Sequence, residues 1–83
     1  MDLKQFNTMS KSRKVRNLLI NGSCIGERNI EDAQVMLFQL QSFYVEVFLN
    51  SEGDEVLHTR SFEDIEELRP YLEQVNTAGL YVT

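Results

Sequence analysis

The sequence predicts an α+β fold with an N-terminal helix, a three- to four-stranded antiparallel β-meander and a C-terminal helix. Residues 33–61 indicate the sheet, because runs rich in β-branched and aromatic residues alternate there with short polar breaks. Residues 10–22 and 62–76 indicate the helices, because their apolar residues recur at helical spacing. A chain of 83 residues can form one small domain with a modest core, residues 1–83.

Composition and charge narrow the class of protein. No run approaches the roughly 20 apolar residues of a membrane-spanning helix, and residues 1–14 lack the apolar segment of a signal peptide, so we expect no membrane association. The single cysteine, Cys24, cannot form an internal disulfide, which favours a reducing, cytoplasmic location. The net charge of −5 disfavours non-specific binding of nucleic acid.

The first helix is expected to begin after Ser10, a favourable N-cap residue, and to end at Asn21 and Gly22. Its apolar stripe is predicted to contain Val15, Leu18 and Leu19. Its basic residues are Lys11, Arg13, Lys14 and Arg16. Residues 1–9 and 77–83 are expected to be flexible tails.

Residues 23–30 are predicted to form an edge strand with a β-bulge at Gly26. A rival interpretation exists for the next stretch, because Asn29 and the two acids that follow Ile30 look like the start of a helix over residues 29–40. That helix would be apolar almost all round and would leave residues 43–50 without a strand partner. We therefore prefer the strand.

A two-residue turn at Gln41 and Ser42 sets the register of the next two strands, in which residue i pairs with residue 83 − i. A five-residue loop over residues 51–55 then leads into the third run of the meander. The predicted pairs across this loop are Leu49 with Leu57, Val47 with Thr59, Phe48 with His58 and Glu46 with Arg60. This register makes one face wholly apolar, with Met36, Phe38, Leu40, Phe43, Val45, Val47, Leu49 and Leu57.

The second helix is predicted to open with a capping-box-like pattern at Ser61 and to be kinked or split at Pro70. Its apolar stripe is predicted to be Phe62, Ile65, Leu68, Leu72 and Val75. Both helices are expected to pack on the apolar face of the sheet.

The opposite face of the sheet, here called the second face, is the main functional lead. The interface candidates on it are Val35, Leu37, Tyr44, Glu46, Phe48, His58 and Arg60. Monomers rarely leave so much contiguous apolar surface exposed without a use. The preferred hypothesis is a non-enzymatic protein-interaction module that self-associates as a homodimer through this face or binds another protein there.

Two alternatives remain open. The first is weak binding of nucleic acid or anions by the four basic residues of the first helix, although no aromatic residues are interleaved with them. The second is a small-ligand or catalytic site around His58, with Arg60, Glu46 and Tyr44 as neighbours. A nucleophile pair of His58 and Cys24 lacks an evident third group to orient it. No motif indicates a cofactor, and the acidic loop lacks the ligand positions of a calcium site, so we expect no metal.

Overall fold

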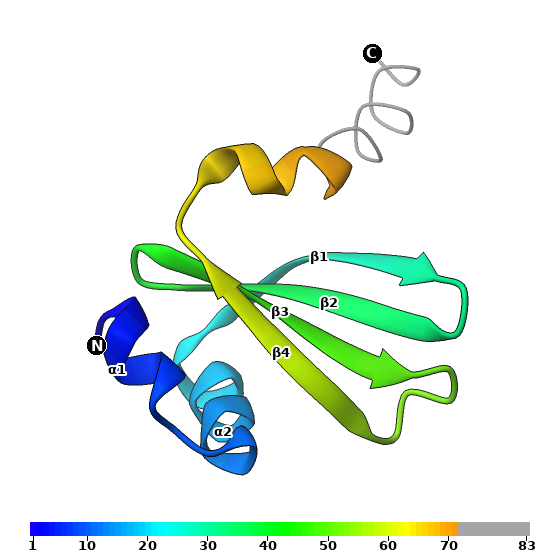
Figure 1. Cartoon of the computed structure of the whole chain (residues 1–83), viewed down its shortest axis with the longest axis horizontal. Coiled ribbons are helices and arrows are strands. Elements are labelled where there is room, and N and C mark those ends of the chain that lie inside the picture. Colours follow the sequence, from blue (N-terminus) through cyan, green and yellow to red (C-terminus); the bar gives the residue numbers. More distant parts are fainter. Residues whose placement is uncertain (72–83) are drawn as a thin grey trace.

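A four-stranded antiparallel sheet lies at the centre of the protein, with helical segments before and after it (Figure 1). The structure is a computed structural model that describes residues 1–71. Its elements are α1 (Leu3–Asn7), α2 (Lys11–Asn21), β1 (Ser23–Ile30), β2 (Ala33–Leu40), β3 (Phe43–Asn50), β4 (Val56–Phe62) and the 3₁₀ helix η1 (Ile65–Leu68). The strands follow one another in the sheet in chain order. The predicted α+β fold and meander are confirmed.

The first residues form a short helix, α1, where a flexible tail was expected. Asp2 caps this helix by accepting a hydrogen bond from the Gln5 amide at 2.8 Å, and the Gln5 side chain accepts one from the Asp2 amide at 3.0 Å. Phe6 is 0% exposed and its ring packs at a tilt against Phe43, with 5.5 Å between the centroids. The prediction of a tail over residues 1–9 is wrong because Phe6 belongs to the core.

The second helix, α2, has the predicted ends. The Ser10 hydroxyl accepts a hydrogen bond from the Arg13 amide at 3.3 Å, and Gly22 follows the last residue as C-cap. A side chain on Gly22 would place its Cβ 2.8 Å from the Leu18 carbonyl oxygen, so the close turn into β1 favours glycine. Leu18 is buried as predicted, whereas Leu19 is exposed.

Strand β1 occupies one edge of the sheet, and its pairing with β2 shifts between Cys24 and Gly26. The predicted edge strand and the bulge are therefore confirmed. Residues 33–40 form strand β2, so the rival helix over residues 29–40 does not form.

The pairing of β2 with β3 follows the predicted register throughout. It includes the predicted partners Leu40 and Phe43, which flank the turn, and Gln41 adopts a positive φ of 58° within that turn. The clean division of the two faces explains this success, since a slip by one residue would exchange every side chain between faces.

The pairing of β3 with β4 contains a bulge that the sequence did not predict. Leu49 pairs with Val56, and Leu57 has no partner in β3. The predicted register resumes at the pair of Phe48 and His58. The contacts of Asn50 with the loop explain the shift. Its backbone amide donates to the Glu55 carbonyl, and its side-chain oxygen accepts from the amides of Asp54 and Glu55. These bonds close the loop so that Val56, the next residue, pairs with Leu49. Leu57 is consequently 46% exposed, and its predicted place on the apolar face is wrong.

The C-terminal helical segment begins later than predicted. Ser61 lies inside β4, opposite Val45, and Asp64 caps η1 by accepting a hydrogen bond from the Glu66 amide. Residues 69–71 continue as a helical turn. Of the predicted stripe, Phe62 and Leu68 are buried and Ile65 is exposed. Leu72 and Val75, like the expected tail 77–83, lie outside the described residues.

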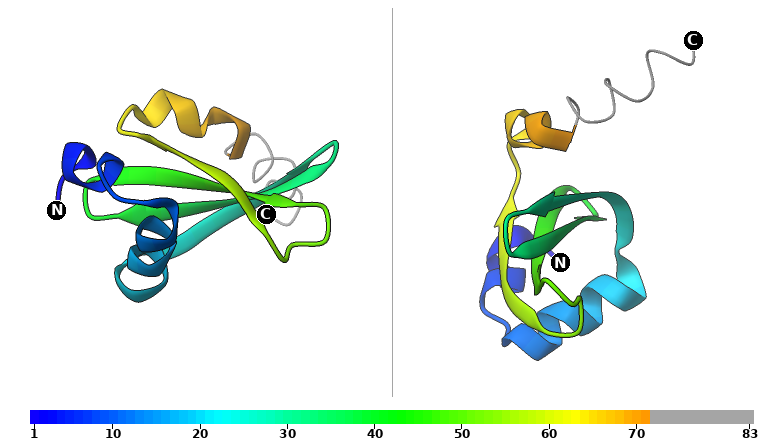
Figure 2. Two further views of the ribbon diagram at one scale, coloured as in Figure 1. Left: turned by 60° about the horizontal axis from the view of Figure 1, so that its bottom comes forward. Right: turned by 90° about the vertical axis from the view of Figure 1, so that its right-hand side faces the viewer.

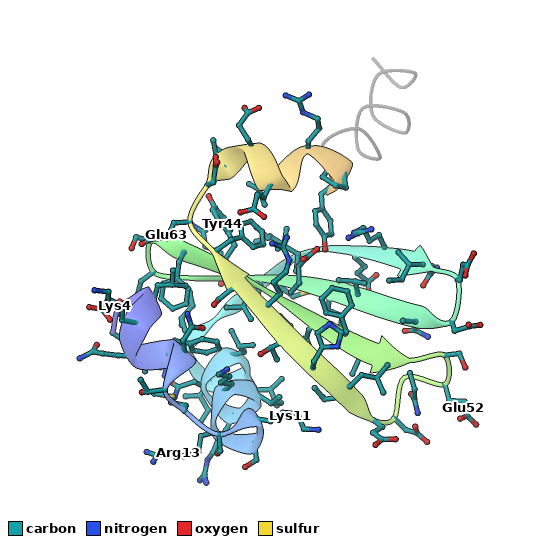
Figure 3. The ribbon with its side chains drawn as sticks, viewed as in Figure 1. Lys4, Lys11, Arg13, Tyr44, Glu52 and Glu63 are labelled. Carbon is teal, nitrogen blue, oxygen red and sulfur yellow. The ribbon has the colours of Figure 1, made fainter. Side chains whose placement is uncertain are left out.

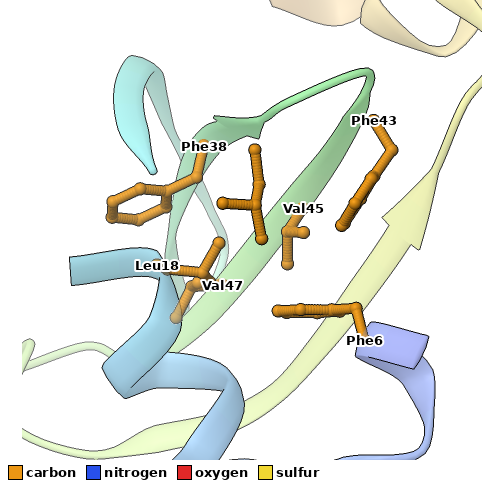
Figure 4. Packing of buried hydrophobic residues seen from close by; sticks show 7 residues of the cluster. Phe6, Leu18, Phe38, Phe43, Val45 and Val47 are labelled. Carbon is orange, nitrogen blue, oxygen red and sulfur yellow. The ribbon is translucent and has the colours of Figure 1, made fainter. Parts of the chain in front are cut away.

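The helical segments cover opposite faces of the sheet, which corrects the expectation that both pack on the apolar face (Figure 2). Helices α1 and α2 cover that apolar face, where their core residues meet those of β2 and β3 (Figure 4). The cluster on this side is Phe6, Leu18, Phe38, Leu40, Phe43, Val45 and Val47. The segment after β4 covers the second face instead, because Leu68 and Tyr71 supply apolar surface there. Within residues 1–71, no helix has the length and apolar composition needed to cross a bilayer.

Candidate functional site

A buried carboxylate, that of Glu46, lies in the middle of the second face. The Tyr71 hydroxyl donates to its Oε2 at 2.6 Å, Arg60 Nε donates to its Oε1 at 2.9 Å, and Arg28 Nη2 donates to its Oε2 at 3.3 Å. The donors come from the C-terminal turn, β4 and β1. Glu46 is 1% exposed, so these contacts replace the water that its charge loses on burial.

The protonation of this cluster follows from the same contacts. Burial alone raises the pKa of the Glu46 carboxyl, but the hydrogen bonds from Tyr71 and then from Arg60 outweigh burial and hold this pKa below its usual value. Burial, followed by the hydrogen bond to Glu46, raises the pKa of the Tyr71 hydroxyl to about 12. At neutral pH Glu46 is therefore ionised and Tyr71 keeps the proton that it donates.

The C-terminal segment covers the second face around this cluster. The apolar residues buried together here are Val35, Leu37, Phe62, Leu68 and Tyr71. Gly26 leaves room for this packing, because a Cβ at this position would lie 3.2 Å from Cδ1 of Tyr71, closer than an ordinary contact. The bulge glycine of β1 thus provides space for the ring that donates to Glu46.

The structure divides the predicted interface residues into two groups. Val35, Leu37 and Glu46 are buried under the C-terminal segment, so the expectation that they face solvent is wrong. The four others keep access to solvent: Tyr44 and Phe48 are half-buried, and His58 and Arg60 are exposed. Figure 3 shows Tyr44 close to the C-terminal segment.

The predicted pairs on the second face do form. The rings of Phe48 and His58 stack with 4.2 Å between their centroids, and Arg60 binds Glu46. The structure separates the candidate nucleophile pair, since Cys24 and His58 lie on the two edge strands, roughly 14 Å apart across the sheet at normal strand spacing. Within residues 1–71, no group of three or more histidine, cysteine or acidic side chains is arranged to hold a metal ion.

The apolar face contains a concave surface that sequence reasoning missed. A cavity of about 130 Å³ opens between α2 and strands β2, β3 and β4, and we call it the α2 groove. The strand ends near the β1–β2 turn and the β3–β4 loop project beyond α2, as Figure 1 shows, so the helix does not cover this part of the sheet. All the residues that line the groove are apolar: Val15, Leu18, Leu19, Met36, Phe38, Val47, Leu49 and Val56.

Two aliphatic side chains on α2 are largely exposed. Leu19, at the rim of the groove, is 71% exposed, and its neighbour Ile20 is 67% exposed. Successive residues of a helix point about 100° apart, so Ile20 points away from the groove. The sequence held a signal for this surface, because Leu18, Leu19 and Ile20 are consecutive and one narrow stripe cannot bury all three.

The four basic residues of α2 surround the helix and differ in their contacts. Lys11 Nζ donates to the Val56 carbonyl at 3.0 Å, beside the groove, and Lys14 Nζ lies 5.7 Å from the centre of the Phe6 ring. Among residues 1–71, none of the four forms an ion pair. Arg13 projects away from the sheet, whereas Lys11 lies on the side toward β4 (Figure 3). Comparison of the chain with protein-family models, with curated proteins and with solved structures gave no match.

Proposed function

We propose that this protein is a non-enzymatic protein-interaction module that binds its partner in the α2 groove. The observation that carries the proposal is the wholly apolar lining of an open groove with Leu19 exposed at its rim. An apolar side chain that fills a pocket supplies much of the affinity at many interaction sites, and this groove offers such a pocket.

The groove is a better candidate than the second face. On the second face, the C-terminal segment already packs on Val35 and Leu37, and Glu46 already has partners within the chain. Above the α2 groove, the described residues supply no such cover, since Leu19 keeps most of its surface in solvent. The free energy available from removing this surface from water therefore favours a partner here.

A peptide-display selection against the folded protein tests the proposal. Leu19→Ser removes an apolar side chain at the groove, and Ile20→Ser, the matched control, removes one of similar exposure that points elsewhere. Burial of a leucine side chain is worth about 1.5–3 kcal/mol, so we expect Leu19→Ser to weaken the selected peptides by roughly 10- to 100-fold. Ile20→Ser should change affinity by less than about twofold. Peptides that bind both variants equally would refute the groove as the binding surface.

Self-association through the second face is a proposal that a separate measurement tests. Its accessible part centres on the Phe48–His58 stack. Sedimentation velocity at increasing protein concentration should show a dimer that Phe48→Glu dissociates. A monomer at every concentration would exclude this form of the proposal and leave the groove as the interaction surface.

A further inference from the structure

The size and the charges of the α2 groove specify the partner more closely, and this inference rests on the proposed function. We infer that the partner is an acidic amphipathic peptide segment of another protein, which inserts one apolar side chain into the groove and places a carboxylate on Arg16. The apolar contact supplies affinity and the carboxylate supplies orientation.

The volume limits what can enter. A cavity of about 130 Å³ is close to the roughly 150 Å³ of an engineered apolar cavity that holds one benzene molecule. One leucine or phenylalanine side chain matches this volume, while a longer apolar stretch would remain outside. The partner therefore presents a single apolar anchor, and its other residues lie over the rim.

The helix that forms one wall of the groove is basic. Residues 10–22 contain four basic residues and no acidic ones. Arg16 lies three residues before Leu19, so the two side chains are neighbours on the same side of α2. Arg13 precedes Leu19 by six residues, which places it on a different side of the helix. Arg16 is therefore the basic residue of α2 nearest to Leu19, and a carboxylate that passes over the Leu19 side of the rim meets Arg16 before Arg13.

The other end of the groove borders the acidic loop between β3 and β4. Lys11 is engaged with the Val56 carbonyl, and these two residues border a second depression together with Asp54 and Glu55. The acids of this loop disfavour another negative charge at that end. The charges around the groove are therefore asymmetric, and they direct the acidic residues of the partner toward Arg16.

The experiment compares two charge reversals on the same helix. Peptides selected on the wild-type protein should combine an apolar residue with neighbouring Asp or Glu, and Arg16→Glu should weaken them by about three- to tenfold. Arg13→Glu changes the net charge equally and should alter affinity by less than about twofold. Replacing the peptide's acids by Lys should restore binding to the Arg16→Glu protein. Fluorescence anisotropy measures the affinities, and circular dichroism checks that both variants are folded.

Other outcomes would overturn this inference in distinguishable ways. Selected peptides that depend on Leu19 but are neutral or basic would refute the acidic partner and leave the proposed function intact. The absence of any Leu19-dependent peptide would refute both. Submicromolar binding of a 20-nucleotide single-stranded DNA at physiological salt, weakened equally by Arg13→Glu and Arg16→Glu, would identify a nucleic-acid surface instead.

Discussion

Replacing Glu46 by glutamine should destabilise the fold more than any other single loss of charge within residues 1–71. The change removes the negative charge at which Tyr71, Arg60 and Arg28 converge. The glutamine keeps one carbonyl oxygen, but its amide group places donors against the guanidinium donors of the arginines. Each hydrogen bond to a buried charged group contributes about 1.5–3 kcal/mol, and removing one member of a buried pair costs about 3–5 kcal/mol.

The structure places the expected cost of Glu46→Gln near the lower end of the range for breaking a buried pair. The side chains of Arg28 and Arg60 are 28% and 46% exposed, so water can solvate them once the carboxylate is gone. We therefore expect Glu46→Gln to lower the free energy of unfolding by about 2–4 kcal/mol, measured by urea denaturation at pH 7. The matched control is Glu67→Gln, which removes the exposed partner of Arg60 and should cost less than about 1 kcal/mol.

The pH dependence provides an independent check. The pKa of Glu46 is lowered in the folded state, so its contribution to stability is present above the unfolded value near 4.5 and is lost as the pH falls through the folded value. The pKa of Tyr71 is raised to about 12, so its contribution is present below pH 10 and is lost as the pH rises toward 12.

Each variant should lose the pH dependence of stability that its own residue contributes. Glu46→Gln should flatten the acid limb of the stability curve, and Tyr71→Phe, with a cost of about 1.5–3 kcal/mol, should flatten the alkaline limb. If Glu46→Gln does not fold, Tyr71→Phe tests the same cluster. A Glu46→Gln protein as stable as the wild type, with an unchanged acid limb, would refute the assigned role of the carboxylate.

Three further predictions follow from the packing, each measured by urea denaturation. Gly26→Ala should lower stability by about 1–2 kcal/mol, because the new methyl group displaces the Tyr71 ring, and an unchanged protein would mean that the ring has free space. Phe6→Ala should cost about 3–5 kcal/mol, whereas a flexible N-terminus would give no effect. Val56→Ala should cost about 1 kcal/mol and Leu57→Ala less than about 0.5 kcal/mol, and the reverse order would contradict the bulge.

Local patterns were sufficient for a large part of the fold. The pairing of β2 with β3 follows from alternation, because only one register separates the apolar residues from the mixed ones. The ends of α2 follow from Ser10 and Gly22, whose capping preferences act within a few residues. The bulge at Gly26 follows from a glycine within a strand pattern. Each of these signals depends on neighbours in the chain or on a single strand pair.

Only the tertiary structure decided which segment covers which surface. Tyr71 reaches Glu46 across 25 positions of the chain, and this contact turns a predicted exposed face into a buried one. Phe6 enters the core from a helix of five residues, which is too short to be predicted from periodicity alone, and Leu19 stays outside although it fits the stripe of α2. The spacing of apolar residues in the sequence predicts which face of a helix or strand they share. This spacing does not predict which segment packs on that face, because distant segments of the chain compete for the same apolar surface.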